Sequence, residues 1–474
     1  MKDFIKWAVA ILAIPFSTLI LADSYDIPNQ YNRDSPVTEK LRQAEAAMQS
    51  KDFAVAFEIY KVLAAQGTAS AQYQLGYLYQ KGLGTPQDDH LAVAWYLKAV
   101  KQGVPQAQYA LGSMYYNGVT VNQAADQAIS LFKQAAVNNY APAQYMLGTA
   151  YYSGMGLPKD LALARLWFEK AAAQGMAAAQ YNAGMMYYNG EGMPARDVAK
   201  AVPYFTAAGQ QGFAKAESML GLMSVMGEGV QLDKAKALAW FNVAAQQGLP
   251  VAQYNLGVMY YNGWGVAPNL KLALNWIGKA AVQNLPKAEY FLGYLESNGI
   301  GVAKNDQQAL EWYLRAGIQA FPEAEFAMGY MYHNGLGTPK NDEKAFAWYG
   351  AAAKHGLSKA QYMVANFYQQ GLGVPADLQA AAMWYGKAAE QGMDNAQLLL
   401  GTFYAEGKGV GVDNRVAYVW LDLASTSNIQ QVRSSAIQYR NNIAKLLKPD
   451  EIRAAKQMAQ MYYSKYTISS TSSI

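Results

Sequence analysis

The chain of 474 residues contains no cysteine. This absence excludes disulfides, cysteine nucleophiles and thiolate metal sites. It also excludes the lipid anchor of a bacterial lipoprotein, which is attached to a cysteine behind the signal sequence. The chain has no N-x-[ST] sequon either, so we do not expect N-glycosylation. If such a chain is exported, the absence of cysteines and sequons is more typical of a bacterial envelope or secreted protein than of a eukaryotic luminal one.

Charged residues are scarce, at 15% of the chain, and the net charge is only +4. No basic run strengthens this weak charge, so we predict no nucleic-acid partner. The three histidines, His90, His333 and His355, fall in different units of the repeat described below. They form no cluster with metal-ligand spacing, and we predict no metal and no cofactor. A G-x-S-x-G nucleophile elbow is also absent.

A single pattern, Ala-Gln-Tyr-x-Leu-Gly with variants, recurs at intervals of 36 residues, with one interval of 37. Its last slot is filled ten times, by Gly76, Gly112, Gly148, Gly184, Gly221, Gly257, Gly293, Gly329, Ala365 and Gly401. A fixed period of about 20 to 50 residues is typical of solenoids and other arrays. Such proteins bury their core between neighbouring repeats and present one long surface, and they usually bind rather than catalyse.

Each unit contains two helical patterns separated by a G-x-G turn. A glycine inside the first helix costs about 1 kcal/mol relative to alanine, so its recurrence predicts close approach of a partner helix. Four residues past most of the turns stands Asp or Asn, for example Asp160, which predicts the N-cap of the second helix. Tryptophan recurs in that helix, as at Trp276, and we expect it to lie in the core between stacked helices.

The strings Ala-x-Tyr-x-Leu-Gly-x-x-Tyr-x-x-Gly-x-Gly-Val and Ala-x-x-Trp-Tyr-x-x-Ala-Ala-x-x-Gly resemble the Sel1-like repeat, a relative of the tetratricopeptide repeat. The resemblance covers roughly three quarters of the chain, in ten copies. It implies an all-α fold, a right-handed superhelical solenoid of antiparallel helix pairs, and a role as adaptor or scaffold. It names no partner, because the shared residues are the ones that pack.

The N-terminus resembles a secretory signal peptide. Lys2 and Lys6 precede an apolar stretch, residues 7–21, that ends at the small residue Ala22. This stretch is shorter than the roughly 20 residues of a membrane span, so we expect cleavage and no integral span afterwards, with an uncleaved anchor as the alternative. The predicted division is 1–22 signal peptide, 23–36 linker, 37–67 N-terminal capping helix pair, 68–428 ten repeats, 429–466 C-terminal capping helices and 467–474 disordered tail.

The chain has 36 tyrosines, and many lie on one side of the predicted first helices. With the repeat glycine as zero and about 100° per residue, slots −3, +1 and +4 lie opposite the apolar residues. If first helices line the concave face, these side chains form a partner-binding groove. A tyrosine at −3 can instead pack against the adjacent repeat, whereas the varied residue types at +4 favour exposure. The candidates are Tyr77, Tyr109, Tyr116, Tyr145, Tyr152, Tyr181, Tyr188, Tyr254, Tyr261, Tyr294, Tyr330 and His333.

We therefore predict an exported, non-enzymatic adaptor, periplasmic or secreted, that binds a protein or peptide through its concave surface. The resemblance suggests envelope assembly or host interaction as settings. The alternative is an envelope scaffold that binds glycan or peptidoglycan, because tyrosine and tryptophan also stack on sugars. An enzyme is a third reading, since some members of the resembled family have been credited with β-lactam hydrolysis. The absence of a cysteine and of a serine nucleophile elbow disfavours it.

Overall fold

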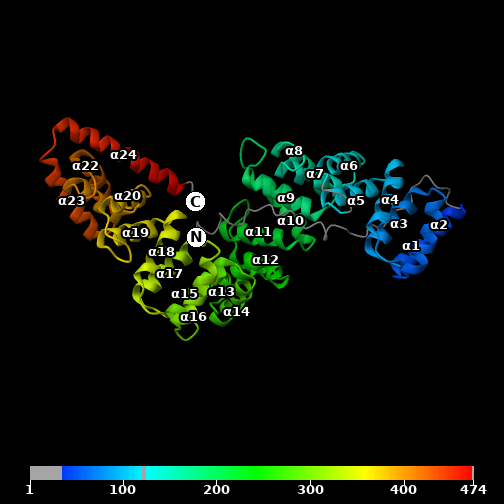
Figure 1. Cartoon of the computed structure of the whole chain (residues 1–474), viewed down its shortest axis with the longest axis horizontal. Coiled ribbons are helices and arrows are strands. Elements are labelled where there is room, and N and C mark those ends of the chain that lie inside the picture. Colours follow the sequence, from blue (N-terminus) through cyan, green and yellow to red (C-terminus); the bar gives the residue numbers. More distant parts are fainter. Residues whose placement is uncertain (1–34, 120–123, 472–474) are drawn as a thin grey trace. The chain divides into compact units, whose positions relative to one another are not determined.

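The computed structural model describes residues 35–119 and 124–471, and these form 24 helices and no strand (Figure 1). Adjacent helices pack as pairs, which confirms the predicted all-α class. The predicted signal peptide, 1–22, and most of the linker lie outside the described residues. Among the residues described, no helix is long and apolar enough to cross a membrane.

The helices are short and of similar length, mostly 12 or 13 residues in the repeats. Those of the first half are α1 Pro36–Gln49, α2 Phe53–Ala65, α3 Ala69–Lys81, α4 Asp89–Lys101, α5 Pro105–Tyr116, α6 Ala125–Val137, α7 Ala141–Ser153, α8 Leu161–Ala173, α9 Ala177–Asn189, α10 Val198–Gln210, α11 Ala214–Met226 and α12 Lys234–Gln246. Those of the second half are α13 Pro250–Asn262, α14 Leu270–Val282, α15 Pro286–Asn298, α16 Asp306–Gly317, α17 Pro322–Asn334, α18 Asp342–Lys354, α19 Ser358–Gln370, α20 Leu378–Ala389, α21 Asp394–Glu406, α22 Asn414–Ala424, α23 Gln430–Ala444 and α24 Pro449–Thr471.

Local sequence explains where the paired helices end. The first helix α7 stops at Gly154, whose φ of 78° is a left-handed conformation that costs glycine nothing. The second helix α8 begins after Asp160, whose side chain accepts a bond from Leu163 N at 2.9 Å. The predicted cap is therefore confirmed. The second glycine of a G-x-G turn is needed where two repeats approach closely. At Gly409, for example, a Cβ would overlap the carbonyl oxygen of Leu378 in the preceding repeat.

The repeat glycine confirms the predicted close approach of a partner helix. A Cβ on Gly148 would lie 2.6 Å from the ring of Phe168, the residue that follows the tryptophan slot. The side chain at this second position is buried in every repeat: Tyr96, Phe132, Phe168, Phe205, Phe241, Ile277, Tyr313, Tyr349, Tyr385 and Leu421.

The expectation that the tryptophans form the core is wrong for all but Trp420. The others, including Trp276, are only half-buried. The tryptophan and the core residue after it are neighbours in sequence, so they point about 100° apart on the second helix and only one can face the first helix. The core residue takes that place, and the tryptophan lies to the side, against the preceding repeat. There it carries a basic side chain from its own helix, as where Lys279 Nζ lies 4.2 Å from the Trp276 ring.

A glutamine at slot −4 joins successive repeats. Gln144 donates to the carbonyl oxygen of Ala136 in the preceding repeat at 3.2 Å and accepts from Gln174 at 2.7 Å. The same bonds recur at Gln72, Gln253 and Gln361. Glutamate replaces glutamine at residue 289, where the buried carboxylate pairs with Arg315. The ladder satisfies buried polar groups between repeats, which an apolar residue at this slot would leave unpaired.

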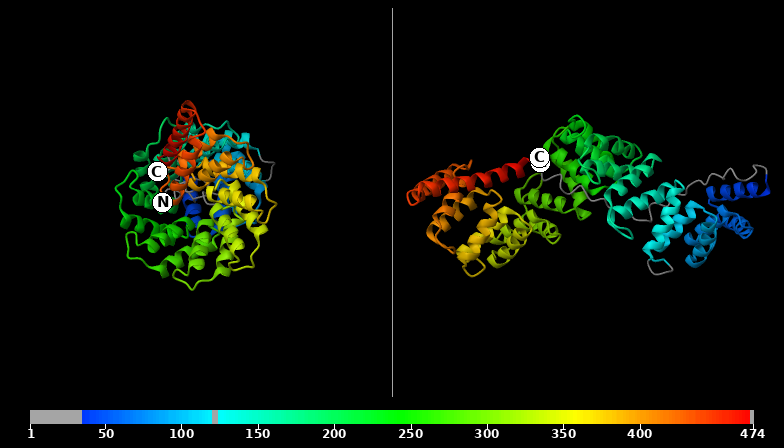
Figure 2. Two further views of the ribbon diagram at one scale, coloured as in Figure 1. Left: turned by 90° about the vertical axis from the view of Figure 1, so that its left-hand side faces the viewer. Right: turned by 90° about the horizontal axis from the view of Figure 1, so that it is seen from above.

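The described chain divides into two compact units, with the boundary between Trp240 and Phe241 inside α12. The first unit precedes this boundary, and the second unit follows it. Within each unit, helix pairs follow one another in chain order, and each pair packs on the next (Figure 2). The second unit ends in two helices outside the repeat period, of which α24 packs on α22. Because α24 continues to Thr471, residues 467–471 are helical, although we expected a disordered tail from residue 467.

Candidate functional site

The predicted tyrosines at slot −3 are packing residues. Tyr109, Tyr145 and Tyr181 are buried, and Tyr254 is half-buried. Each ring of the first three lies against the core aromatic residue of its own second helix, as where the Tyr145 and Phe168 centroids are 5.6 Å apart. The alternative that a tyrosine at −3 packs against the adjacent repeat holds for Tyr109 and Tyr181, whose rings also lie 5.6 Å from Tyr140 and 5.3 Å from Phe213, the N-cap residues of the next first helices. Tyr109, Tyr145 and Tyr181 are therefore inaccessible to a partner, and including these three among the contact residues was wrong.

The tyrosines at slot +4 reach the G-x-G turn of the following repeat. The hydroxyl of Tyr116 bonds to Met155, and that of Tyr152 is hydrogen-bonded to Glu191. Met155 and Glu191 are the middle residues of successive turns. Burial and the Glu191 carboxylate raise the pKa of Tyr152 to about 12, so this phenol stays protonated at neutral pH. These two tyrosines are half-buried bridges between repeats.

Tyr188 makes a similar bridge, to a carboxylate that also binds an arginine. Its hydroxyl donates to Glu228 Oε2 at 2.6 Å, and Arg196 bonds to the same oxygen at 2.7 Å while its guanidinium lies 4.4 Å from the tyrosine ring. Burial and the Glu228 carboxylate raise the pKa of Tyr188. The side chain is only 3% exposed, so the expectation that +4 points to solvent is wrong at this position.

The remaining candidates differ in accessibility. Tyr261 is half-buried, with its ring 5.2 Å from Phe291 of the next repeat, and Tyr77 is half-buried on α3. His333 is also half-buried, and its Nδ1 lies 2.6 Å from Asp342 Oδ1. Most of the tyrosine set thus belongs to the packing of the array.

Two tyrosines at slot +1 are open to solvent. Tyr294 on α15 is 37% exposed and Tyr330 on α17 is 52% exposed. They occupy the same slot of consecutive first helices, 36 residues apart. Tyr294 is held by a stacked neighbour, Phe291, at a centroid distance of 6.0 Å. From the predicted set of tyrosines, the structure therefore retains a smaller exposed aromatic surface, in the second unit.

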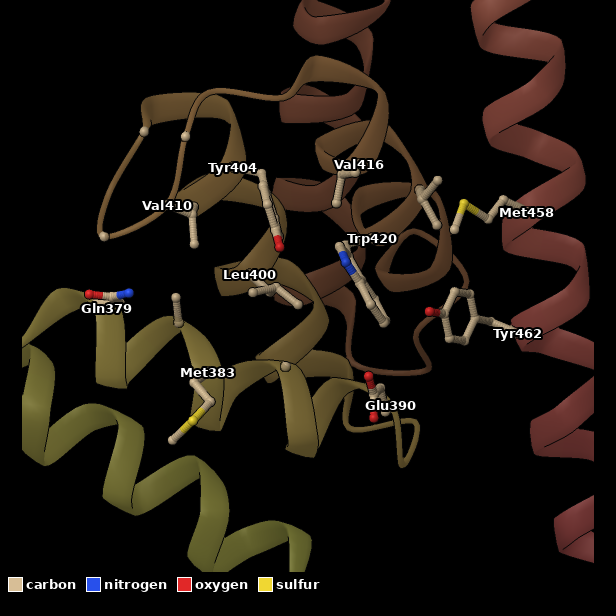
Figure 3. Close-up of a pocket in the computed structure, with 16 residues that line it drawn as sticks. Gln379, Met383, Glu390, Leu400, Tyr404, Val410, Val416, Trp420, Met458 and Tyr462 are labelled. Atoms are coloured by element: carbon tan, nitrogen blue, oxygen red, sulfur yellow. The ribbon is translucent and has the colours of Figure 1, made fainter.

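The second unit also contains a groove of about 900 Å³ that the sequence did not point to (Figure 3). It lies between α20, α21, α22 and α24. Leu400, Val416, Val419 and Trp420 supply apolar side chains, and the Trp420 ring lies 4.9 Å from that of Tyr462 on α24. The sequence feature that could have indicated a groove here is the loss of the repeat period after Trp420. A helix that does not follow the period packs differently from a further repeat, and it leaves space that a repeat would fill.

Catalytic and metal-binding arrangements find little support among the described residues. No group of three or more histidine, aspartate or glutamate side chains there is placed to hold a metal ion. A Ser-x-x-Lys sequence, found in enzymes that react with β-lactams, occurs at Ser130 and Lys133 on α6. Both side chains are exposed to solvent, an environment that does not activate a serine nucleophile.

Comparison with known proteins settles the family. The Sel1 repeat model matches ten consecutive segments, 69–104, 105–139, 141–176, 177–213, 214–249, 250–284, 286–320, 322–357, 358–393 and 394–428. The chain belongs to the Sel1 repeat family. The predicted family is thereby confirmed, and these repeats form a solenoid in which the described helices pair. Among curated proteins, none matches the chain.

Two solved structures of Sel1 repeat proteins are similar over most of the chain. One is a protective antigen present in uropathogenic Escherichia coli strains, displaying an SLR fold. It is 34% identical, with a TM-score of 0.72, over 91% of this chain and 92% of that one. The other is a Sel1 repeat protein from Oxalobacter formigenes, 29% identical, with a TM-score of 0.51, over 74% of this chain and 99% of that one.

Proposed function

We propose that this Sel1 repeat protein is an exported, non-enzymatic scaffold that binds a protein or peptide through an aromatic surface on α15 and α17. The observation that carries the proposal is the exposure of Tyr294 and Tyr330 at one slot of consecutive first helices. In the other repeats this slot holds Tyr77, Ser113, Thr149, Met185, Leu222, Val258, Asn366 and Thr402. Tyr77 is half-buried and stands alone, and the other seven residues are not aromatic, so two exposed tyrosines at consecutive first helices are a local feature that packing of the repeat does not require.

The chemistry of tyrosine supports a protein partner. Tyrosine presents a large contact area with few rotamers to lose, and its hydroxyl adds a hydrogen bond, so binding surfaces are rich in it. Stacking on Phe291 restrains Tyr294 before any partner arrives, which lowers the entropic cost of binding. Folds of stacked repeats supply an extended surface along which several such contacts can be made at once.

Export rests on the N-terminal sequence and on one relative. The basic, apolar and small-residue segments of 1–22 have the order of a signal peptide. The similar E. coli protein is a protective antigen, which supports an exported location by analogy. N-terminal sequencing of the protein from its native cell tests this: a new terminus near Asp23 supports export with cleavage, and an intact Met1 on membrane-bound protein favours an anchor.

Affinity capture tests the binding proposal. The chain from residue 23 to 474, immobilised and exposed to native envelope and medium fractions, is compared with its Tyr294→Ala/Tyr330→Ala variant by mass spectrometry. We expect a protein that the parent chain retains and the variant loses. Recovery of polysaccharide or peptidoglycan alone would favour the glycan alternative and contradict the proposal.

A further inference from the structure

We propose a second docking site: the groove between α20, α21, α22 and α24 binds a peptide segment that carries apolar side chains and a lysine or arginine, with the basic group beside Glu390. This inference rests on the proposed function, since it assumes that the scaffold binds proteins, and it adds a site and the chemistry of its partner. It uses neither Tyr294 nor Tyr330.

The apolar part of the groove is built for side chains of varied shape. Its walls combine Val416, Val419 and Trp420 of α22 with Leu400 of α21 (Figure 3). Two methionines add to the lining, Met383 on α20 at 51% exposure and Met458 on α24 at 48%. Methionine is unbranched and polarisable, and it is common on surfaces that adapt to different peptides. A volume of about 900 Å³ is large for a single side chain and falls within the range of ligand sites.

The charge of the groove selects a cation. Glu390 is the one charged residue among those that line it, and its side chain is exposed to solvent. Glu390 is also the C-cap of α20, where the backbone carbonyls carry the negative end of the helix dipole. Lys387, one turn earlier, has its ammonium 4.1 Å from the Trp384 ring. A carboxylate and a helix C-terminus together favour a basic group from a partner.

The length of the site indicates a peptide. Gln379, Met383, Gly386 and Glu390 follow one another at three or four residues along one face of α20. The eleven residue steps from Gln379 to Glu390 span about 17 Å, which matches roughly five residues of extended chain. A Cβ on Gly386 would meet nothing within 4 Å, so the helix backbone is open to close approach midway along the groove. One extended segment can therefore contact the apolar walls and reach Glu390.

Selection from a phage library of random dodecapeptides tests the inference, with the full-length protein as bait. We expect enriched peptides to combine apolar residues with a lysine or arginine. For a selected peptide measured by fluorescence anisotropy, Glu390→Lys should weaken binding at least about tenfold, because it turns attraction into repulsion. Replacing the basic residue of the peptide by glutamate should restore binding to that variant.

Glu311→Lys is the matched control, because Glu311 is exposed on α16 and does not line the groove. It makes the same charge change and should leave peptide affinity unaltered. Equal weakening by both variants, or no enrichment of basic peptides, would overturn the inference. So would a dimer of the chain that Glu390→Lys dissociates, since a second copy would then occupy the groove. Loss of peptide binding in Tyr294→Ala/Tyr330→Ala would overturn it and leave the proposed function standing.

Discussion

Gly329 on α17 lies directly against the ring of Tyr349 on α18, and a Cβ at residue 329 would be 2.6 Å from Tyr349 Cδ1. The same relationship between the repeat glycine and the core side chain recurs in the repeats of Gly76, Gly112, Gly148, Gly184, Gly257, Gly293 and Gly401. This contact sets the distance between the two helices of each pair. It explains why a residue that weakens an isolated helix recurs at this slot.

Gly329→Ala should therefore destabilise its repeat. Overpacking costs about 1 to 3 kcal/mol, which exceeds or cancels the gain of about 1 kcal/mol in helix propensity. Ala365 fills the same slot opposite Tyr385, so the ring can give way and the cost should fall in the lower part of that range. Gly350→Ala is the control, since nothing lies within 4 Å of its Cβ position, and it should stabilise. Urea unfolding measures both variants. A Gly329→Ala variant more stable than Gly350→Ala would contradict the claim that the repeat glycine is required by close contact with the core ring.

Truncation of a core ring should cost more than truncation of the tryptophan beside it. Phe168 is fully buried, and Phe168→Ala should destabilise by about 3 to 5 kcal/mol, whereas half-buried Trp167→Ala should cost clearly less. In a repeat protein the damage should stay near the mutated repeat. Hydrogen exchange should show lost protection in α7 and α8 while distant repeats persist. Uniform loss across the chain would contradict nearest-neighbour stability.

The buried carboxylate of Glu289 should make its repeat sensitive to pH. Burial raises its pKa above the ordinary 4.5, against the opposing effect of Arg315. At pH values between the ordinary pKa and the raised pKa of the folded chain, folded Glu289 holds a proton that the unfolded chain has lost. The free energy of unfolding therefore falls as pH rises through this range. Glu289→Gln should remove the dependence, because Gln253 at the same slot donates to Ala245 O without titrating. Hydrogen exchange of α15 and α16, corrected for intrinsic rates, measures it; a dependence that persists in the variant contradicts the account.

The phenol of Tyr188 should contribute to stability through one hydrogen bond. Tyr188→Phe keeps the ring and removes the donor to Glu228, and a bond to a charged group contributes about 1.5 to 3 kcal/mol. Tyr116→Phe is the matched variant, because the acceptor there is the thioether of Met155, a weak acceptor, and it should cost much less. Thermal or urea unfolding measures the loss in free energy of unfolding for each variant. Equal losses would contradict the prediction that the bond to the Glu228 carboxylate stabilises the fold more than the bond to Met155.

The repeat period predicted the fold because each of its signals acts locally. Asp160 caps a helix and Gly154 ends one whatever surrounds them. The accessible surface was harder to predict. A helical wheel for one pair treats the side opposite the core as free, yet in a stack the neighbouring repeat covers it, and Tyr188 is buried there.

The repeat period showed where the repeats end, after Trp420, but it could not locate the groove. Its far wall, with Met458 and Tyr462, comes from α24, which has no counterpart in the repeats. Where that helix packs depends on long-range contacts with α22, such as Trp420 with Tyr462, and the sequence pattern does not reveal which residues meet. The Gln144 ladder was visible as a recurring glutamine, but its bonding depends on the stacking of the helices.

The affinity of the captured partner for the parent chain and for Tyr294→Ala/Tyr330→Ala tests the central claim most directly. Truncating an aromatic contact residue typically costs more than about 1 kcal/mol of binding, so the double variant should raise Kd at least about tenfold. Both side chains are exposed, so its unfolding curve should match the parent. Tyr439→Ala, an exposed tyrosine of α23, should leave Kd unchanged. A folded double variant that binds with the parent's Kd would contradict the claim that α15 and α17 form the contact surface.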